Sequence, residues 1–273
     1  MANPSTNEPE SLTAATGEKP EKRAARLILV TRPAPDGPRL ISDLDTIGQA
    51  SVFTPVMDIT PNDAPVDLNG IAALAFTSAN GVRAFIEKSD RRDLPAFAVG
   101  PATAAVCAEA GFHDVSIAGG DVGALADLIA GASGKLSGDV LHVAGVHRAS
   151  DLSALLVERN VSAQRSVLYE AVARKAVDTK TLTALENSEA NGRPIWALFY
   201  SARSARLFVD QLNAAGGAVH IPNITAACLR EAVAVAAKEA AGETRWKDVL
   251  VANEKADDPV LHLMSQGIHT STS

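Results

Sequence analysis

The chain has 273 residues, of which 47% are hydrophobic and only 4% aromatic, and its formal net charge is −7 at pH 7. This length and apolar content allow two α/β domains with separate cores, whereas no run of residues is long and apolar enough to span a membrane. The acidic balance argues against a nucleic-acid-binding protein, which normally has a basic face. It leaves an anionic small molecule open, because local arginines and helix N-termini decide such binding.

The first 25 residues are rich in Pro, Ser, Thr, Glu and Ala and contain no apolar stretch. This composition is not that of a signal peptide, and it predicts a disordered tail over residues 1–25. Cys107 and Cys228 both lie in Ala-rich helical patterns and give no disulfide framework. We therefore expect a protein of the reducing cytoplasm.

Beyond the tail, apolar runs alternate with helical patterns, which is typical of a mostly parallel α/β sheet. In chain order we expect strands over residues 26–31, 71–76, 96–99, 114–117, 139–143, 195–199, 221–225 and 248–251. Helical spacing predicts helices over residues 37–48, 80–88, 102–110, 122–130, 150–160, 179–188, 204–215, 229–241 and 258–266. Two further segments, 51–60 and 164–173, are extended connectors.

The two connectors bracket a complete run of strand–helix units, which predicts that one domain is inserted into the other. Residues 26–53 together with 171–266 would form lobe 1, and the inserted residues 54–170 would form lobe 2. Two adjacent extended strands that cross between lobes form a flexible hinge, and the cleft between the lobes is the expected ligand site.

One short phrase occurs in both halves of the chain. Phe76-Thr77-Ser78-Ala79 and Phe199-Tyr200-Ser201-Ala202 each follow an apolar run and precede an amphipathic stretch. Each copy predicts a buried strand that runs into a Ser-capped helix. A helix N-terminus offers backbone N–H groups to an anion, so two copies predict an anionic ligand that bridges two similar lobes.

Several common kinds of site are excluded by their missing patterns. The six histidines are scattered and lack partners at ligand spacing, so we expect no metal. No strand is followed by the glycine pattern of dinucleotide binding, and the P-loop and nucleophile-elbow motifs are missing too. Ser78 and Ser201 have no adjacent histidine, which favours capping and ligand contacts over nucleophilic roles.

What remains is a set of strand-to-helix junctions that carry hydroxyl groups, glycines and arginines. Open α/β sheets bind ligands at such carboxyl ends of strands. A single residue of this kind is more commonly a helix cap or a solvated surface charge, but five similar junctions together predict a large ligand with several carboxylates or phosphates. The predicted binding residues are Thr31, Arg32, Thr77, Ser78, Gly100, Thr103, Gly145, Arg148, Ser201 and Arg203.

Tyr169 is one of only two tyrosines and lies in the second connector. A tyrosine there more commonly packs in a core, but its position beside the hinge and the expected cleft predicts a ligand contact. No apolar seam stands out on the predicted surface, and we expect a monomer.

Four segments, 27–33 (LILVTRP), 76–82 (FTSANGV), 98–104 (AVGPATA) and 199–202 (FYSA), resemble the uroporphyrinogen-III synthase family. The resemblance runs in order from about residue 26 to 265 and includes the tyrosine of the second connector. It implies two Rossmann-like or flavodoxin-like lobes joined by a two-stranded ladder. It also implies a cofactor-free lyase of tetrapyrrole (haem) biosynthesis, which closes hydroxymethylbilane with inversion of ring D and loss of water.

Under this resemblance Tyr169 would be the catalytic residue, a hydrogen-bond donor that assists departure of the substrate hydroxyl. Ser78, Thr103 and Ser201 would orient carboxylates together with neighbouring N–H groups. One segment departs from the family, which often has a second Gly-x-Thr junction where this chain reads ACLREA over residues 227–232.

Three other functions are also compatible with the sequence. A degenerate synthase-like protein, serving as a two-lobed binding or regulatory module for a polyanion, is favoured by the unusual junction at 227–232. A solute-binding protein would have the same hinged architecture but would carry an export signal. A nucleotide-dependent enzyme would change its melting temperature with NAD or ATP.

Overall fold

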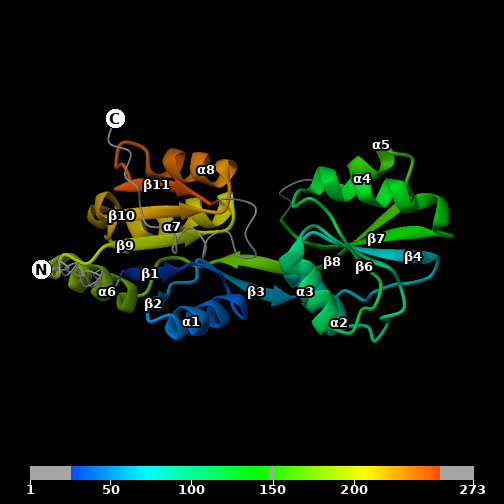
Figure 1. Cartoon of the computed structure of the whole chain (residues 1–273), viewed down its shortest axis with the longest axis horizontal. Helices are drawn as coiled ribbons and strands as arrows, with labels where there is room; N and C mark the ends of the chain where they lie inside the picture. Colours follow the sequence, from blue (N-terminus) through cyan, green and yellow to red (C-terminus); the bar gives the residue numbers. More distant parts are fainter. Residues whose placement is uncertain (1–25, 148–150, 253–273) are drawn as a thin grey trace, which may run out of the picture.

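The computed structural model describes residues 26–147 and 151–252, which fold into two lobes, each built on one β-sheet (Figure 1). The expected tail (1–25), the expected helix at 258–266 and Arg148 lie outside the described residues. Within these ranges no helix has the length and hydrophobicity needed to cross a membrane.

The first lobe contains a five-stranded parallel sheet whose strands come from both ends of the described chain. Its order is β11-β10-β9-β1-β2. The strands are β1 (Leu27–Val30), β2 (Ala50–Phe53), β9 (Ile195–Phe199), β10 (Ile224–Cys228) and β11 (Asp248–Val251). The helices of this lobe are α1 (Asp36–Thr46), α6 (Thr179–Ala190), α7 (Ala202–Ala214), the 3-10 helix η2 (Ala218–Asn223) and α8 (Glu231–Ala241).

The second lobe takes the residues between these segments and contains a six-stranded sheet of order β3-β8-β7-β4-β5-β6. Among the strand pairs that the described residues form in this sheet, only β3–β8 is antiparallel. The strands are β3 (Met57–Pro61), β4 (Ile71–Phe76), β5 (Ala96–Ala98), β6 (Val115–Ile117), β7 (Asp139–Gly145) and β8 (Ala163–Ala173). The helices are α2 (Ala79–Ile86), α3 (Pro101–Glu109), α4 (Val122–Ala132), the 3-10 helix η1 (Ser133–Lys135) and α5 (Leu152–Glu158).

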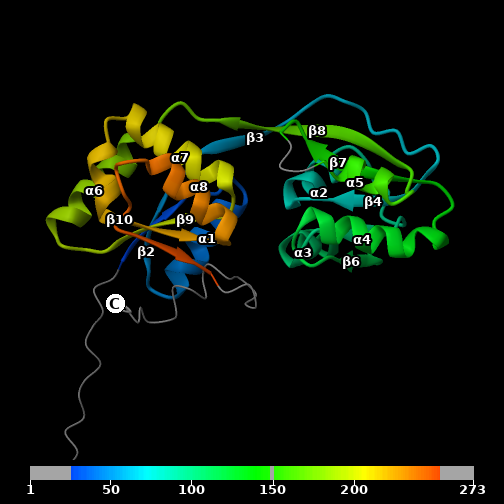
Figure 2. The same cartoon turned by 90° about the horizontal axis from the view of Figure 1, so that it is seen from above.

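The strand orders confirm the predicted fold class. In the first lobe, β2-β1-β9-β10-β11 follows the flavodoxin order 2-1-3-4-5, and in the second, β6-β5-β4-β7-β8 follows the Rossmann order 3-2-1-4-5. The β3–β8 ladder joins the lobes along one side of the molecule (Figure 2). The domain boundaries at 53/54 and 170/171 stay predictions.

The carboxyl ends of both sheets point toward each other. β2 continues through residues 54–56 into β3 of the second lobe, so its carboxyl end and those of its parallel neighbours face that lobe. β8 ends where the chain returns to the first lobe, and β4, β5, β6 and β7 run parallel to it. We call the edges formed by these facing carboxyl ends the interlobe face.

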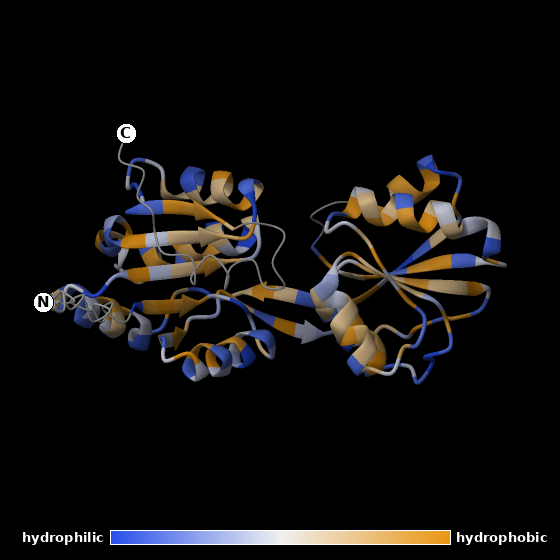
Figure 3. Ribbon diagram, viewed as in Figure 1, coloured by the Kyte–Doolittle hydropathy of each residue, from blue (hydrophilic) through white to orange (hydrophobic). Residues whose placement is uncertain are grey.

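Each sheet is covered by apolar side chains on both sides, as expected for parallel sheets. The strands of both sheets accordingly carry much of the hydrophobic colour in Figure 3. Every residue of β1 and β9 is buried. In the first lobe, Phe199, Phe208 and Trp246 form an aromatic cluster with ring centroids 5.5–6.2 Å apart. These cores hold the strand ends in fixed positions, which fixes the junctions that follow them.

One strand differs from its expected position. The expected strand at 221–225 is β10, which begins only at Ile224, because residues 218–223 form the 3-10 helix η2 around Pro222. Proline has no N–H to donate to a sheet ladder, so the strand starts beyond it.

Candidate active site

Two topological switch points face each other across the interlobe face. In the first lobe the strand order reverses between β1 and β9, which lead to Thr31 and Ser201. In the second lobe it reverses between β4 and β7, which lead to Ser78 and end at Gly145. Because open α/β sheets bind ligands outside the carboxyl ends of strands at these points, the topology brings these four predicted residues to the two expected binding positions.

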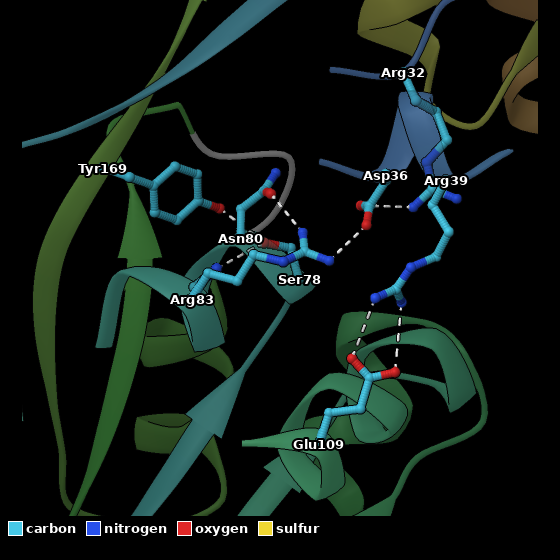
Figure 4. A network of polar contacts seen from close by, with 9 residues as sticks. Arg32, Asp36, Arg39, Ser78, Asn80, Arg83, Glu109 and Tyr169 are labelled. Atoms are coloured by element: carbon cyan, nitrogen blue, oxygen red, sulfur yellow. Dashed lines mark hydrogen bonds and ion pairs between the residues drawn. The ribbon is translucent and has the colours of Figure 1, made fainter. Parts of the chain in front are cut away.

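Ser78 and Tyr169 form the central contact of the second lobe. Ser78 is the N-cap of α2, where its Oγ accepts a hydrogen bond from Gly81 N at 3.3 Å. The same Oγ lies 2.8 Å from the Tyr169 hydroxyl, and either group can donate (Figure 4). The pair joins β4, α2 and β8 at the interlobe face.

Gly145 lies against the ring of Tyr169, where a side chain would clash with it. It pairs with Tyr169 at an irregularity in the β7–β8 ladder, and a Cβ atom at Gly145 would lie 2.9 Å from Cε2 and Cζ of the tyrosine ring. Any larger residue would therefore displace the ring and its hydroxyl. Gly145 thus fixes the position of Tyr169.

The environment of Tyr169 keeps its hydroxyl protonated. Burial raises the pKa of Tyr169, while the hydrogen bond with Ser78 and the charge of Arg165 oppose this shift without cancelling it. Because the ordinary pKa of tyrosine is already about 10, the phenol is neutral at physiological pH and can donate a hydrogen bond.

In the matching junction of the first lobe, the capping serine is hydrogen-bonded within its own helix. Ser201 is the N-cap of α7 and accepts a hydrogen bond from Ser204 N at 3.1 Å, while Ser201 N donates to Ser204 Oγ at 3.2 Å. Arg203 donates to the backbone oxygen of Ala171 in β8 at 2.8 Å. Burial lowers the pKa of Arg203, and the nearby Glu170 opposes this shift. This junction therefore fastens the hinge strand to the first lobe.

Thr31, Thr77, Gly100 and Thr103 also follow strand ends at the interlobe face, but each makes different contacts. Thr31 is buried and donates to the backbone oxygen of Leu198, which ties β1 to β9. Thr77 Oγ1 lies 3.4 Å from His142 Nε2. Gly100 is the N-cap of α3, and Thr103 is buried in the first turn of that helix.

Arg32, Asp36 and Arg83 form a cluster of charged side chains. Of these three, only Arg32 was among the predicted binding residues. Asp36 Oδ2 accepts from Arg32 at 2.9 Å, and Asp36 Oδ1 accepts from Arg83 of the opposite lobe at 2.5 Å (Figure 4). Burial alone would raise the pKa of Asp36, but the two arginines outweigh it and lower that pKa. The only sequence signal was that Arg83 follows the Ser-Ala phrase.

The junction that departs from the family makes another contact between the lobes. Arg230 is the N-cap of α8 without a side-chain capping bond, and its guanidinium donates to Gly120 O at 3.1 and 3.2 Å. The arginine thus bonds to the opposite lobe instead of capping its own helix.

Other reactive groups lie away from this face or are inert. Burial raises the pKa of Cys107 and of Cys228 to about 12, so neither thiol is a nucleophile at neutral pH. A surface cavity of about 460 Å³ is lined by Lys238, Arg245, Trp246 and Lys247, at the amino end of β11, which points away from the interlobe face. Among residues 26–147 and 151–252, no group of three or more His, Cys, Asp and Glu is arranged to hold a metal ion.

A family model and several solved structures match this chain. A family model described as Uroporphyrinogen-III synthase HemD matches residues 39–259. The uroporphyrinogen-III synthetase from Helicobacter pylori 26695 is 17% identical with a TM-score of 0.54, covering 88% of this chain and 98% of that chain. A mutant uroporphyrinogen III synthase from the extremely thermophilic bacterium Thermus thermophilus is 15% identical with a TM-score of 0.50, covering 89% and 98%.

At these identities the two solved structures show a shared fold, and no curated protein matches the chain. The family model shows more than the fold, because it matches the sequence over most of both lobes and the ladder between them. The chain therefore belongs to the uroporphyrinogen-III synthase family.

Proposed function

We propose that this protein is a uroporphyrinogen-III synthase, which closes hydroxymethylbilane into a ring with inversion of ring D and loss of water, in tetrapyrrole (haem) biosynthesis. It acts without a cofactor, as a monomer in the cytoplasm. The observation that carries the proposal is the Ser78–Tyr169 hydroxyl pair, which lies at the second-lobe switch point and faces the first-lobe switch point.

Tyr169 acts on the leaving hydroxyl. The neutral phenol donates a hydrogen bond to this hydroxyl and transfers a proton as the C–O bond breaks, so water leaves and an azafulvene cation forms. Ser78 bonds to the phenol oxygen and stabilises the phenolate that results. The pyrrole carbon that finally bonds loses a proton, which returns to the phenolate, so the overall change is loss of one water.

The rest of the site fixes the conformation of the substrate. The linear tetrapyrrole closes without catalysis into the isomer in which ring D is not inverted, so the enzyme must favour attack through the substituted carbon of ring D. The N-termini of α2, α3 and α7 offer backbone N–H groups to the acetate and propionate carboxylates. Holding several carboxylates at once fixes the geometry before the bond forms.

A second candidate is a catalytically degenerate, two-lobed binding or regulatory module for a polyanionic small molecule. The junction before α8 favours it, because Arg230 binds Gly120 O of the opposite lobe and supplies no capping hydroxyl. The two candidates share the ligand class and differ in turnover.

The product isomers distinguish the two candidates. Hydroxymethylbilane is generated in place, the protein is added, and the oxidised uroporphyrins are separated by chromatography. The proposal predicts predominantly isomer III. Isomer I alone, from a sample with a cooperative melting transition, would contradict synthase activity and favour the binding module.

A further inference from the structure

Arg83 is held by a carboxylate of its own chain from across the interlobe face. Asp36 lies at the start of α1 in the first lobe, whereas Arg83 lies on α2 in the second. Their side chains are only 17% and 20% exposed, compared with 58% and 61% for Glu109 and Arg39, which also pair between the lobes (Figure 4). The Asp36–Arg83 contact is therefore largely shielded from solvent.

Both arginines of the cluster are also held by neutral groups. Arg83 Nη1 donates to Asn80 Oδ1 at 3.2 Å, and the Arg32 guanidinium stacks over the Tyr200 ring at 4.5 Å from its centroid. These contacts do not depend on Asp36. The guanidinium groups thus keep their places if Asp36 moves away, and the cluster of two cations and one anion has a net positive charge.

If the lobes open, Arg32 and Asp36 stay together in the first lobe, while Arg83 moves away with the second. Asp36 keeps Arg32, which lies four residues before it in the same lobe, but it loses Arg83. Arg83 then presents unpaired donors beside Ser78, which caps the same helix and contacts Tyr169. A carboxylate of a ligand bound over that N-terminus would meet a guanidinium suited to bind both of its oxygens.

From this geometry we propose that Arg83 binds a carboxylate of the substrate, and that Asp36 is the internal competitor which this carboxylate displaces. The proposal deepens the proposed function and rests on it for the identity of the substrate. Asp36 then opposes binding, because each binding event must first break its ion pair with Arg83.

The competitor model predicts opposite effects at the two ends of one ion pair. Arg83→Gln removes the ligand contact and is expected to raise the dissociation constant about tenfold. Asp36→Asn removes the competing charge and is expected to lower the dissociation constant several-fold. Arg83→Lys keeps the charge without the planar fork and is expected to fall between wild type and Arg83→Gln.

The probe is uroporphyrin III, titrated into the full-length protein at fixed salt and followed by fluorescence. Glu109→Gln is the matched control, because it breaks an exposed ion pair between the same lobes and is expected to change the affinity less than twofold. A thermal melt of each variant establishes that it is folded.

Tighter binding by Asp36→Asn together with weaker binding by Arg83→Gln would support the proposal. Weaker binding by both variants would overturn it, since the pair would then only hold the lobes together, and unchanged binding by both would overturn it as well. The probe reports binding without turnover. Isomer I alone in the activity assay would therefore refute the proposed function without changing what this binding test shows about Arg83 and Asp36.

Discussion

The two Ser-capped junctions have nearly the same local sequence but different partners in space. Ser201 is enclosed by Ser204 in a capping box of its own helix, and its neighbour Arg203 grips the hinge strand. Ser78 has no such box, and its hydroxyl reaches Tyr169 on β8. The duplicated phrase thus supplies a helix N-terminus in each lobe, whereas of the two capping serines only Ser78 is hydrogen-bonded to the tyrosine of β8.

The largest functional difference between the two junctions is expected at Tyr169. Tyr169→Phe keeps the ring against Gly145 and removes only the hydroxyl, so we expect kcat to fall about 10²-fold, as is typical for loss of a general acid. Steady-state turnover measures this loss. Tyr200→Phe, at the other junction, is the matched control and is expected to lose far less; unchanged turnover in Tyr169→Phe would remove this residue from the mechanism.

Gly145→Ala tests whether the position of the tyrosine matters beyond its presence. The new Cβ would lie 2.9 Å from the tyrosine ring, so we expect about tenfold lower kcat through displacement of the hydroxyl. We also expect a stability loss of about 1 kcal/mol from overpacking, measured by urea unfolding. Gly131→Ala in α4 is the control, because a Cβ there meets no atom within 4 Å; equal effects of the two changes would contradict the role of Gly145.

The smallest expected effect is the pH dependence of Asp36. Its pKa is lowered in the folded protein, so the ion pairs add stability above about pH 4, the usual range of an unfolded aspartate. This contribution is lost as the pH falls through the folded pKa. Urea unfolding of wild type and Asp36→Asn should differ by about 1 kcal/mol at pH 7 and converge at lower pH; a constant difference would contradict this account.

Local patterns were enough to predict the fold. The strands at Ile71–Phe76, Ile195–Phe199 and Asp248–Val251 agree with the predicted ranges residue for residue, because each is an apolar run bounded by turn residues. The predicted capping roles of Ser78 and Ser201 are confirmed as well, since capping depends on neighbours three residues away.

The contacts of the site depend on the whole chain. Ser78 and Tyr169 are 91 residues apart and meet only because β4, β7 and β8 lie side by side. Asp36 and Arg83 are 47 residues apart and belong to different lobes, so no periodicity links them. The sequence could place Ser78 and Tyr169 near the same face, but not pair them, and it offered no reason to select Asp36.

The most direct test of the difference between the two junctions is turnover of Ser78→Ala and Ser201→Ala, assayed side by side with hydroxymethylbilane. Each change removes a helix cap, so each should cost about 1 kcal/mol of stability. We predict that Ser78→Ala lowers kcat about tenfold or more, because Tyr169 loses its partner, whereas Ser201→Ala changes kcat less than about threefold. Equal losses of kcat in the two variants would contradict the assignment of the chemistry to the second lobe.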